Sequence, residues 1–163
     1  MALVADLLKE LKPPTWTNEN YTNQRYVKVP LPMDSQEYRE ILLDFKSKYS
    51  FDVVRISRIQ HPFAFCRFKL RQTHLFLNRG TLPKEKRHYV SLHSNGNLHN
   101  FLKNNCDSRC NAKSNSYSNT KYVIVAKTFK DEIFDERDSH RFPEYLIESN
   151  ITSVETSFNR LNI

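Results

Sequence analysis

One run of residues constrains the fold more than any other part of this chain. Residues 121–129 (KYVIVAKTF) carry a string of β-branched and aromatic side chains centred on Tyr122–Ala126. Such a composition is typical of β-strands, because branched and aromatic side chains pack well on a pleated, covered surface. The run therefore predicts a strand with a buried face, and this strand needs partners elsewhere in the chain.

Other segments predict strands that share one sheet region with it. Val53–Ile59 is rich in β-branched residues, His88–Leu92 is short, and Tyr145–Glu148 has Pro143 at its edge. Residues 26–31 alternate in polarity, as a half-buried strand does. The strand positions that we expect to be deeply buried are Ile56, Val123, Val125, Tyr145 and Ile147.

Three amphipathic helices are predicted between the strands. Asp34 or Ser35 is a suitable N-cap for the first, Pro62 lies in the first turn of the second, and Ser94 is a suitable N-cap for the third. Their predicted inward faces are Tyr38, Ile41, Leu42, Phe45 and Tyr49; Phe65, Phe68, Leu75 and Phe76; and Leu98, Phe101 and Leu102.

The predicted order places helices early and β-rich segments late, which indicates an α+β domain. With 163 residues, of which 39% are hydrophobic, the chain is long enough for one packed core. We divide it into an N-terminal amphipathic helix at 1–12, a domain at 13–150 and a polar tail at 151–163. Residues 111–120 are polar and predict an exposed loop.

The N-terminal helix is predicted from leucines at helical spacing, and Pro13–Pro14 ends it. A helix this short is marginal alone, so its apolar face needs a surface, either on its own domain or on a protein partner. The leucines of that face are Leu3, Leu7, Leu8 and Leu11.

The composition limits where the protein acts. A mean hydropathy of −0.67 and the absence of an apolar run of about 18 residues argue against a membrane protein. The 3 cysteines follow no disulfide framework, which fits a reducing compartment. We therefore expect an intracellular protein, nuclear or cytoplasmic, with no membrane contact.

A net charge of +7 permits binding to nucleic acid. Two segments are candidates: the run Lys84–His88, and residues 63–71, where aromatic and basic residues alternate. The first segment can also be interpreted as a solvated basic loop. The second can also be interpreted as a helix whose aromatic residues belong to the core and whose basic side chains point outward. The candidate contacts are Lys84, Lys86, Arg87, Arg67, Lys69 and Arg71.

Cysteine and histidine residues suggest a zinc site only superficially. Cys106 and Cys110, with His93 and His99, lack the second distant pair that structural zinc sites favour. Cys66 lies among aromatic residues and reads as a core thiol. We predict no metal site.

Seven short segments carry more information together than separately. They are Pro13–Trp16, Ser35–Tyr38, Arg58–Gln60, the helix from Pro62, Asn105–Arg109, Val125–Lys127 and Phe142–Ile147. Their order resembles the catalytic domain of the poly(ADP-ribose) polymerases, most closely the mono-ADP-ribosylating and zinc-finger antiviral branch. The resemblance covers residues 13–148. It implies a shortened ADP-ribosyltransferase fold, with mixed, mostly antiparallel sheets and flanking helices.

The same resemblance points to a lost active site. In that family a His-Gly-Thr strand and a tyrosine hold NAD, and a late glutamate orients the ribose. Aligned back from Asn105–Arg109, Ser91 replaces the histidine and Leu92 the glycine, while His93 is two residues out of register. A leucine side chain would occupy the space where the glycine backbone approaches the nicotinamide.

The remaining family positions have only weak counterparts. The glycine-rich tyrosine strand is missing from a chain with 2 glycines, and Tyr117 is the sole aromatic residue in the polar loop. Glu132 and Glu136 occur near the place of the catalytic glutamate, and surface positions explain them equally well.

The resemblance therefore implies a catalytically inactive ADP-ribosyltransferase-like domain that acts as a protein-interaction or scaffolding module, without a cofactor. One alternative is a divergent NAD-dependent mono-ADP-ribosyltransferase that uses His93 or Tyr117 in shifted roles. A second alternative is a basic RNA- or DNA-binding module on the same fold.

Overall fold

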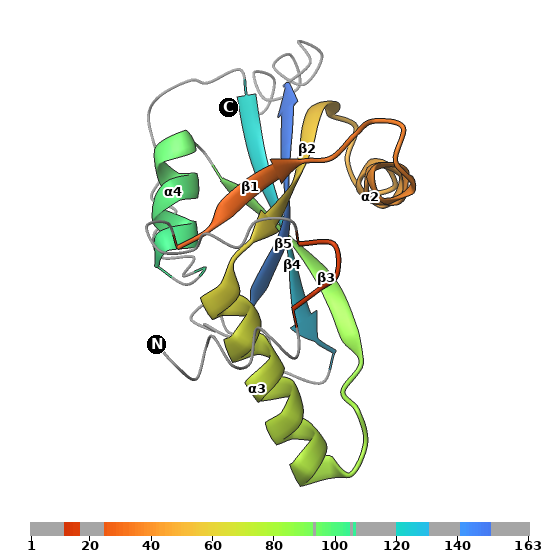
Figure 1. Cartoon of the computed structure of the whole chain (residues 1–163). Coiled ribbons are helices and arrows are strands. Elements are labelled where there is room, and N and C mark those ends of the chain that lie inside the picture. Colours follow the sequence, from red (N-terminus) through yellow and green to blue (C-terminus); the bar gives the residue numbers. More distant parts are fainter. Residues whose placement is uncertain are drawn as a thin grey trace, which may run out of the picture.

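The computed structural model describes residues 12–16, 25–92, 94–104, 106, 120–130 and 141–150. Its elements, in chain order, are β1 (Val27–Pro30), α2 (Gln36–Lys46), β2 (Asp52–Gln60), α3 (Pro62–Arg79), β3 (Glu85–Leu92), α4 (Asn95–Lys103), β4 (Thr120–Phe129) and β5 (Phe142–Asn150) (Figure 1). The α+β class is confirmed, although strands and helices alternate along the described chain instead of helices coming first. The predicted N-terminal leucine face and the tail from residue 151 lie outside the described residues.

The described strands form one sheet with the order β1-β2-β5-β4-β3. Every neighbouring pair is antiparallel. The prediction that 53–59, 88–92, 121–129 and 145–148 share one sheet is confirmed, since each range lies within one of these strands. The described part of the chain thus has one fully antiparallel sheet, where the resemblance implied several mixed ones.

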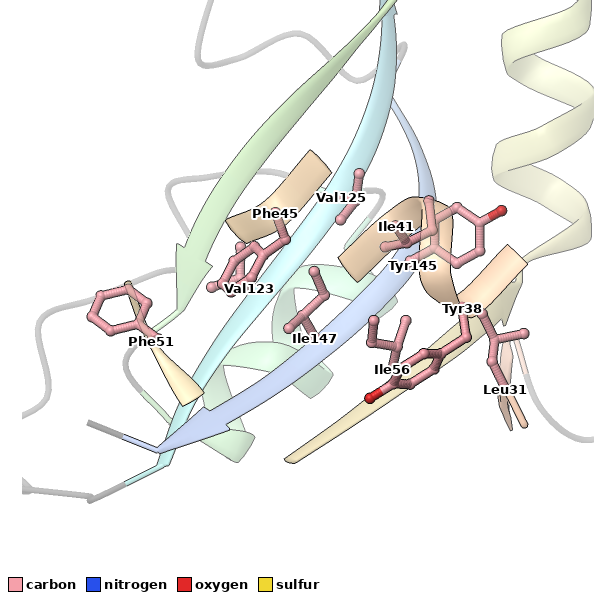
Figure 2. Close-up of a cluster of buried hydrophobic side chains, with 10 residues drawn as sticks. All are labelled: Leu31, Tyr38, Ile41, Phe45, Phe51, Ile56, Val123, Val125, Tyr145 and Ile147. Carbon is pink, nitrogen blue, oxygen red and sulfur yellow. The ribbon is translucent and has the colours of Figure 1, made fainter. Parts of the chain in front are cut away.

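The two faces of the sheet carry separate cores. Helix α2 places Ile41 and Phe45 against one face, where they pack with Val123, Val125 and Ile147 (Figure 2). Helix α4 covers the other face, where the alternate residues of the central strands form a second cluster. The burial predicted for Ile56, Val123, Val125, Tyr145 and Ile147 is confirmed, with exposed fractions of 0–6%.

Capping residues fix where the helices begin. The side chains of Ser35 and Ser94 accept hydrogen bonds from the backbone N–H groups of Tyr38 and Asn97, at 3.2 and 3.1 Å. Pro62 occupies the first helical position of α3, where its missing N–H costs nothing. These starts were all predicted from the sequence.

Strand β5 differs from its prediction. It runs from Phe142 to Asn150 and lies in the middle of the sheet, so Pro143 is inside a central strand. The pairing between β4 and β5 shifts at this point, between Val125 and Ala126, and Ala126 faces Pro143. A bulge lets the sheet accommodate a residue that has no N–H to donate.

The basic run after α3 was predicted as a solvated loop, and that prediction is wrong for most of it. Glu85–His88 belong to β3 and pair with Ala126–Phe129 of β4. Lys84 alone precedes the strand, and its carbonyl accepts a hydrogen bond from the Lys130 N–H at 2.8 Å. Pairing with the strongest strand of the chain overrides the weak β-propensity of these charged residues.

Helix α3 extends to Arg79 and ends at Gly80, whose left-handed backbone (φ 69°) closes the last turn. Phe76 was assigned to its inward face, but its side chain is 41% exposed. Phe65, Phe68 and Leu75 are buried as predicted. No helix in the described ranges is long and apolar enough to cross a membrane.

Candidate functional site

A small cleft of about 130 Å³ opens where α3 meets the sheet. Side chains from distant parts of the sequence reach it, including the segment before β1, the first turn of α2, and the ends of β2, β3, β4 and β5. The lining residues are Pro13, Thr15, Trp16, Glu37, Arg58, Ile59, Phe65, Phe68, Lys69, Glu85, Lys127, Phe142, Glu144 and Tyr145.

One side of the cleft is aromatic. The ring of Trp16 lies 5.3 Å from that of Phe65, which meets Phe142 edge-on at 5.5 Å. Phe68 stacks on Phe129 at 4.6 Å. Trp16 is only 5% exposed. These rings belong to the core cluster that fixes α3 to the sheet, and they give the cleft a rigid apolar wall.

The opposite side begins with a carboxylate held by two partners. Glu37 accepts hydrogen bonds from both Nε and Nη2 of Arg58, and from the Tyr145 hydroxyl at 2.8 Å. Burial alone would raise the pKa of Glu37, but these hydrogen bonds outweigh burial and lower it. Arg58 also donates to the carbonyl of Thr15 at 2.6 Å, which ties the Trp16 segment to the cleft.

A second ion-paired group lies beside the first. Lys127 Nζ contacts Glu144 at 3.0 Å and Glu85 at 3.4 Å, and Arg87 Nε contacts Glu144 at 3.3 Å. Although burial lowers the pKa of Lys127, the two carboxylates outweigh it and raise that pKa. Gln72 donates to Glu85 at 3.1 Å. All three carboxylates of the lining are therefore held by cations.

This arrangement favours structural stability over acid–base chemistry. A general base works best with a pKa near the working pH, whereas Glu37 has a lowered one. The Tyr145 hydroxyl is also a poor proton donor, because burial and the nearby Glu144 and Glu37 raise its pKa. Lys69 also lines the cleft. Its Nζ donates a hydrogen bond to Gln72 at 2.9 Å and lies 5.8 Å from the centre of the Phe65 ring.

The position that the resemblance assigns to NAD lies elsewhere. Ser91 and Leu92 end β3 and pair with Val123 and Tyr122 of β4. Glu85, which lines the cleft, begins the same strand. Seven residues of antiparallel strand span about 24 Å, so the cleft and the Ser91–Leu92 end are well separated. His93, Tyr117, Glu132 and Glu136 lie outside the described residues.

Leu92 is packed into the core. Its exposed fraction is 1%, and it belongs to the cluster formed by α4 and the central strands, with Leu98, Phe101 and Ile124 among its members. Ser91 precedes it and is half-buried. This end of β3 is therefore apolar, in contrast to the charged end at Glu85.

The candidate nucleic-acid contacts do not gather on one surface. Lys86 and Arg87 are neighbours in β3, so they point to opposite faces of the sheet. Arg87 pairs with Glu144, and Lys69 lies at the cleft. Arg67 is half-buried with an enclosed Nε, which differs from the outward course predicted for it. Lys84 is exposed and Arg71 half-buried.

The described part of the chain contains no group of three or more potential metal ligands. Cys66 and Cys106 are both buried and neither forms a disulfide, and burial raises the pKa of Cys106 to about 12. His99 Nδ1 lies 3.0 Å from the Tyr26 hydroxyl. Cys110 and His93 lie outside the described residues.

The residues of the cleft were missed as a site, although most were already noted as motifs. Trp16, Glu37, Arg58, Lys127 and Glu144 each belong to a separate segment of the resemblance to the polymerases. The structure brings these segments together at one place. The sequence signal for this site was the presence of acidic and basic residues in strands that are otherwise apolar. Which acidic residue meets which basic one depends on the register of the sheet.

No model of a known protein family matches the chain. No significant match to a curated protein sequence was found either.

Proposed function

We propose that this chain is a catalytically inactive, poly(ADP-ribose) polymerase-like domain that acts as a protein-interaction or scaffolding module. The proposal combines the sequence resemblance with the chemistry of the two ends of β3. The observation that carries it is the burial of Leu92, at 1% exposed, where the resemblance places a glycine.

Leucine and glycine at this position have different consequences for ligand binding. Without a Cβ, a backbone can approach a ligand closely, and in the resembled family the nicotinamide amide uses that approach. Here a four-carbon side chain is packed into the α4 cluster instead. Replacing it with glycine would open a cavity in the core, so binding NAD and packing α4 place opposite demands on this position.

The cleft at the other end of β3 offers no substitute for the lost machinery. Transfer of ADP-ribose needs a carboxylate set against the ribose and a clamp that positions the nicotinamide. The carboxylates of Glu37, Glu85 and Glu144 are each engaged by a cation of the protein itself. A ligand would have to break those ion pairs to use them.

Incubation with labelled NAD tests the proposal. We expect no transfer of label to the protein or to cell extract, and no thermal shift at millimolar NAD, because a ligand that does not bind the folded state does not stabilise it. An active ADP-ribosyltransferase in the same assay is the positive control. Labelling that disappears in His93→Ala or Glu136→Ala would instead establish the divergent enzyme.

The RNA- or DNA-binding alternative has its own measurement. Binding through basic residues weakens steeply with added salt, because phosphate contacts release counterions. We expect no saturable binding of a single-stranded RNA or a duplex DNA probe at physiological salt. Saturable binding with a steep salt dependence, lost on Lys84→Ala with Lys86→Ala, would favour that alternative.

A further inference from the structure

Helix α3 carries an exposed apolar row on the side away from its core contacts. Phe63, Leu70 and Leu77 are 52%, 50% and 74% exposed. The helix buries Phe65, Phe68 and Leu75 instead, and its C-terminal end extends beyond the sheet in Figure 1. Single exposed apolar residues are common on proteins, whereas a regular row of three large ones indicates a contact surface.

The spacing of the row is regular. Its members are seven residues apart, which corresponds to nearly two turns and a rise of about 10.5 Å between neighbours. The three therefore form a nearly straight line of about 21 Å, drifting by about 20° at each step. Helices that pack side by side repeat apolar residues at two positions in every seven, and this row supplies one of those two positions.

Basic groups lie along one flank of this row. Arg67 follows Phe63 by four residues, and its guanidinium lies 6.0 Å from the centre of that ring. His74 follows Leu70 by four residues and is held by Arg71 at 3.3 Å and Asn78 at 3.2 Å. Helix α3 contains four Arg and Lys residues and no Asp or Glu (PFAFCRFKLRQTHLFLNR).

We propose that the Phe63–Leu70–Leu77 row is a docking surface for an amphipathic helix of another protein, with an apolar seam flanked by Asp or Glu. The seam would cover the row, and the acidic flank would face Arg71 on a helix that has basic residues and no acidic ones. This surface stands on α3 alone, so the proposal holds whether or not the chain transfers ADP-ribose.

Charge and shape favour this occupant over the others. A second copy of the chain would bring two basic helices together, since α3 has no acidic residue. Two of the three residues of the row are leucines, which cannot stack on bases as aromatic rings do, and this argues against nucleic acid. The row is one residue wide, with Thr73 exposed beside it, whereas a helix lying on a membrane needs a broad apolar face.

The test uses the full chain and a synthetic three-heptad helical peptide with a leucine seam and glutamate flanks, labelled for fluorescence anisotropy. We expect saturable binding that Leu70→Glu weakens by at least about tenfold, as for central residues of interfaces. The matched control is Leu43→Glu on α2, because Leu43 is 71% exposed; it should change affinity less than about twofold. Circular dichroism of both variants verifies that they are folded.

Charge reversal provides a second readout. Arg71→Glu should weaken the glutamate-flanked peptide and strengthen a lysine-flanked version of it, a reciprocal change that a loss of folding cannot produce. The proposal is overturned if the acidic peptide does not bind, if a scrambled peptide binds equally well, or if the two leucine variants behave alike.

Three other occupants give distinct results, each of which would also overturn the proposal. Self-association is detected as a dimer in sedimentation that Leu70→Glu dissociates. Binding of the wild type to anionic vesicles or RNA, abolished by the same substitution, would assign the row to those partners. If Leu7→Glu in the full chain raises the affinity for the peptide, then the chain's own N-terminal leucines occupy the row.

Discussion

The two ends of β3 lie in opposite chemical surroundings, although they belong to one strand of eight residues. At Glu85 the neighbours are Lys127, Gln72 and the cleft. At Leu92 the neighbours are the apolar side chains of α4 and the central strands. The polar end lies beside Lys127, which belongs to one of the segments that resemble the polymerases. The apolar end contains Leu92, the position at which the resembled family binds NAD.

This difference gives the residues of the resembling segments a structural role. Glu37, Arg58 and Tyr145 come from three separate motifs, and here they bind one another. Lys127 and Glu144 come from two motifs and form an ion pair of 3.0 Å. These residues join α2, β2, β4 and β5, and this role requires no reaction at the other end of the sheet.

The largest expected effect comes from shortening the Leu92 side chain at the apolar end, and it tests whether that end is tightly packed. Leu92→Ala removes a buried side chain from the α4 cluster and should reduce the free energy of unfolding by about 2–5 kcal/mol. Urea denaturation followed by circular dichroism measures the loss. A cost below about 1 kcal/mol would mean that this end is loosely packed, and it would weaken the case against a ligand there.

Removing the carboxylate of the polar end should have a smaller effect. Glu37→Ala leaves the Arg58 guanidinium, whose side chain is 12% exposed, without its bidentate partner. We expect a loss of about 1–3 kcal/mol, measured by the same denaturation. The control is Asp52→Asn, because the Lys46–Asp52 pair is 40% and 66% exposed at 3.7 Å; its change should stay within about 0.5 kcal/mol. Equal effects of the two substitutions would contradict an enclosed network.

The smallest expected difference between the two ends is in how the free energy of unfolding responds to acid. Because the folded state lowers the pKa of Glu37, its ion pair stabilises the fold above the ordinary carboxyl pKa of about 4.3 and is lost as the pH falls through the lower, folded value. Wild-type stability should therefore fall more than that of Glu37→Gln when the pH drops from about 6 to about 3.5. Leu92→Ala has no titrating group and should show the wild-type slope. Parallel curves for all three proteins would remove Glu37 from the acid response.

Local signals in the sequence were sufficient for much of this fold. The β-branched run of β4, the caps at Ser35 and Ser94, and the proline at the start of α3 each act within a few residues, so they could be identified without a structure. The alternation of burial in the central strands follows from the same local pattern.

The errors arose where a distant partner decides the outcome. The charged residues of β3 form a strand because β4 pairs with them, and Pro143 fits inside β5 because of a bulge opposite Ala126. The cleft depends on the register of β2, β4 and β5 together, which no single segment encodes. The segments that contain its residues could be identified in the sequence, but the fact that these residues lie together in the fold could not.

The sheet order has a consequence for how this chain folds. β5 is the last of the described strands, yet it lies between β2 and β4. Before residues 142–150 are available, the described strands can form only two separate pairs, β1 with β2 and β3 with β4. Insertion of β5 joins them through pairings such as Arg55 with Glu148, 93 residues apart. Loop closure over such separations slows folding, so during synthesis the two described halves of the sheet remain unjoined until β5 emerges.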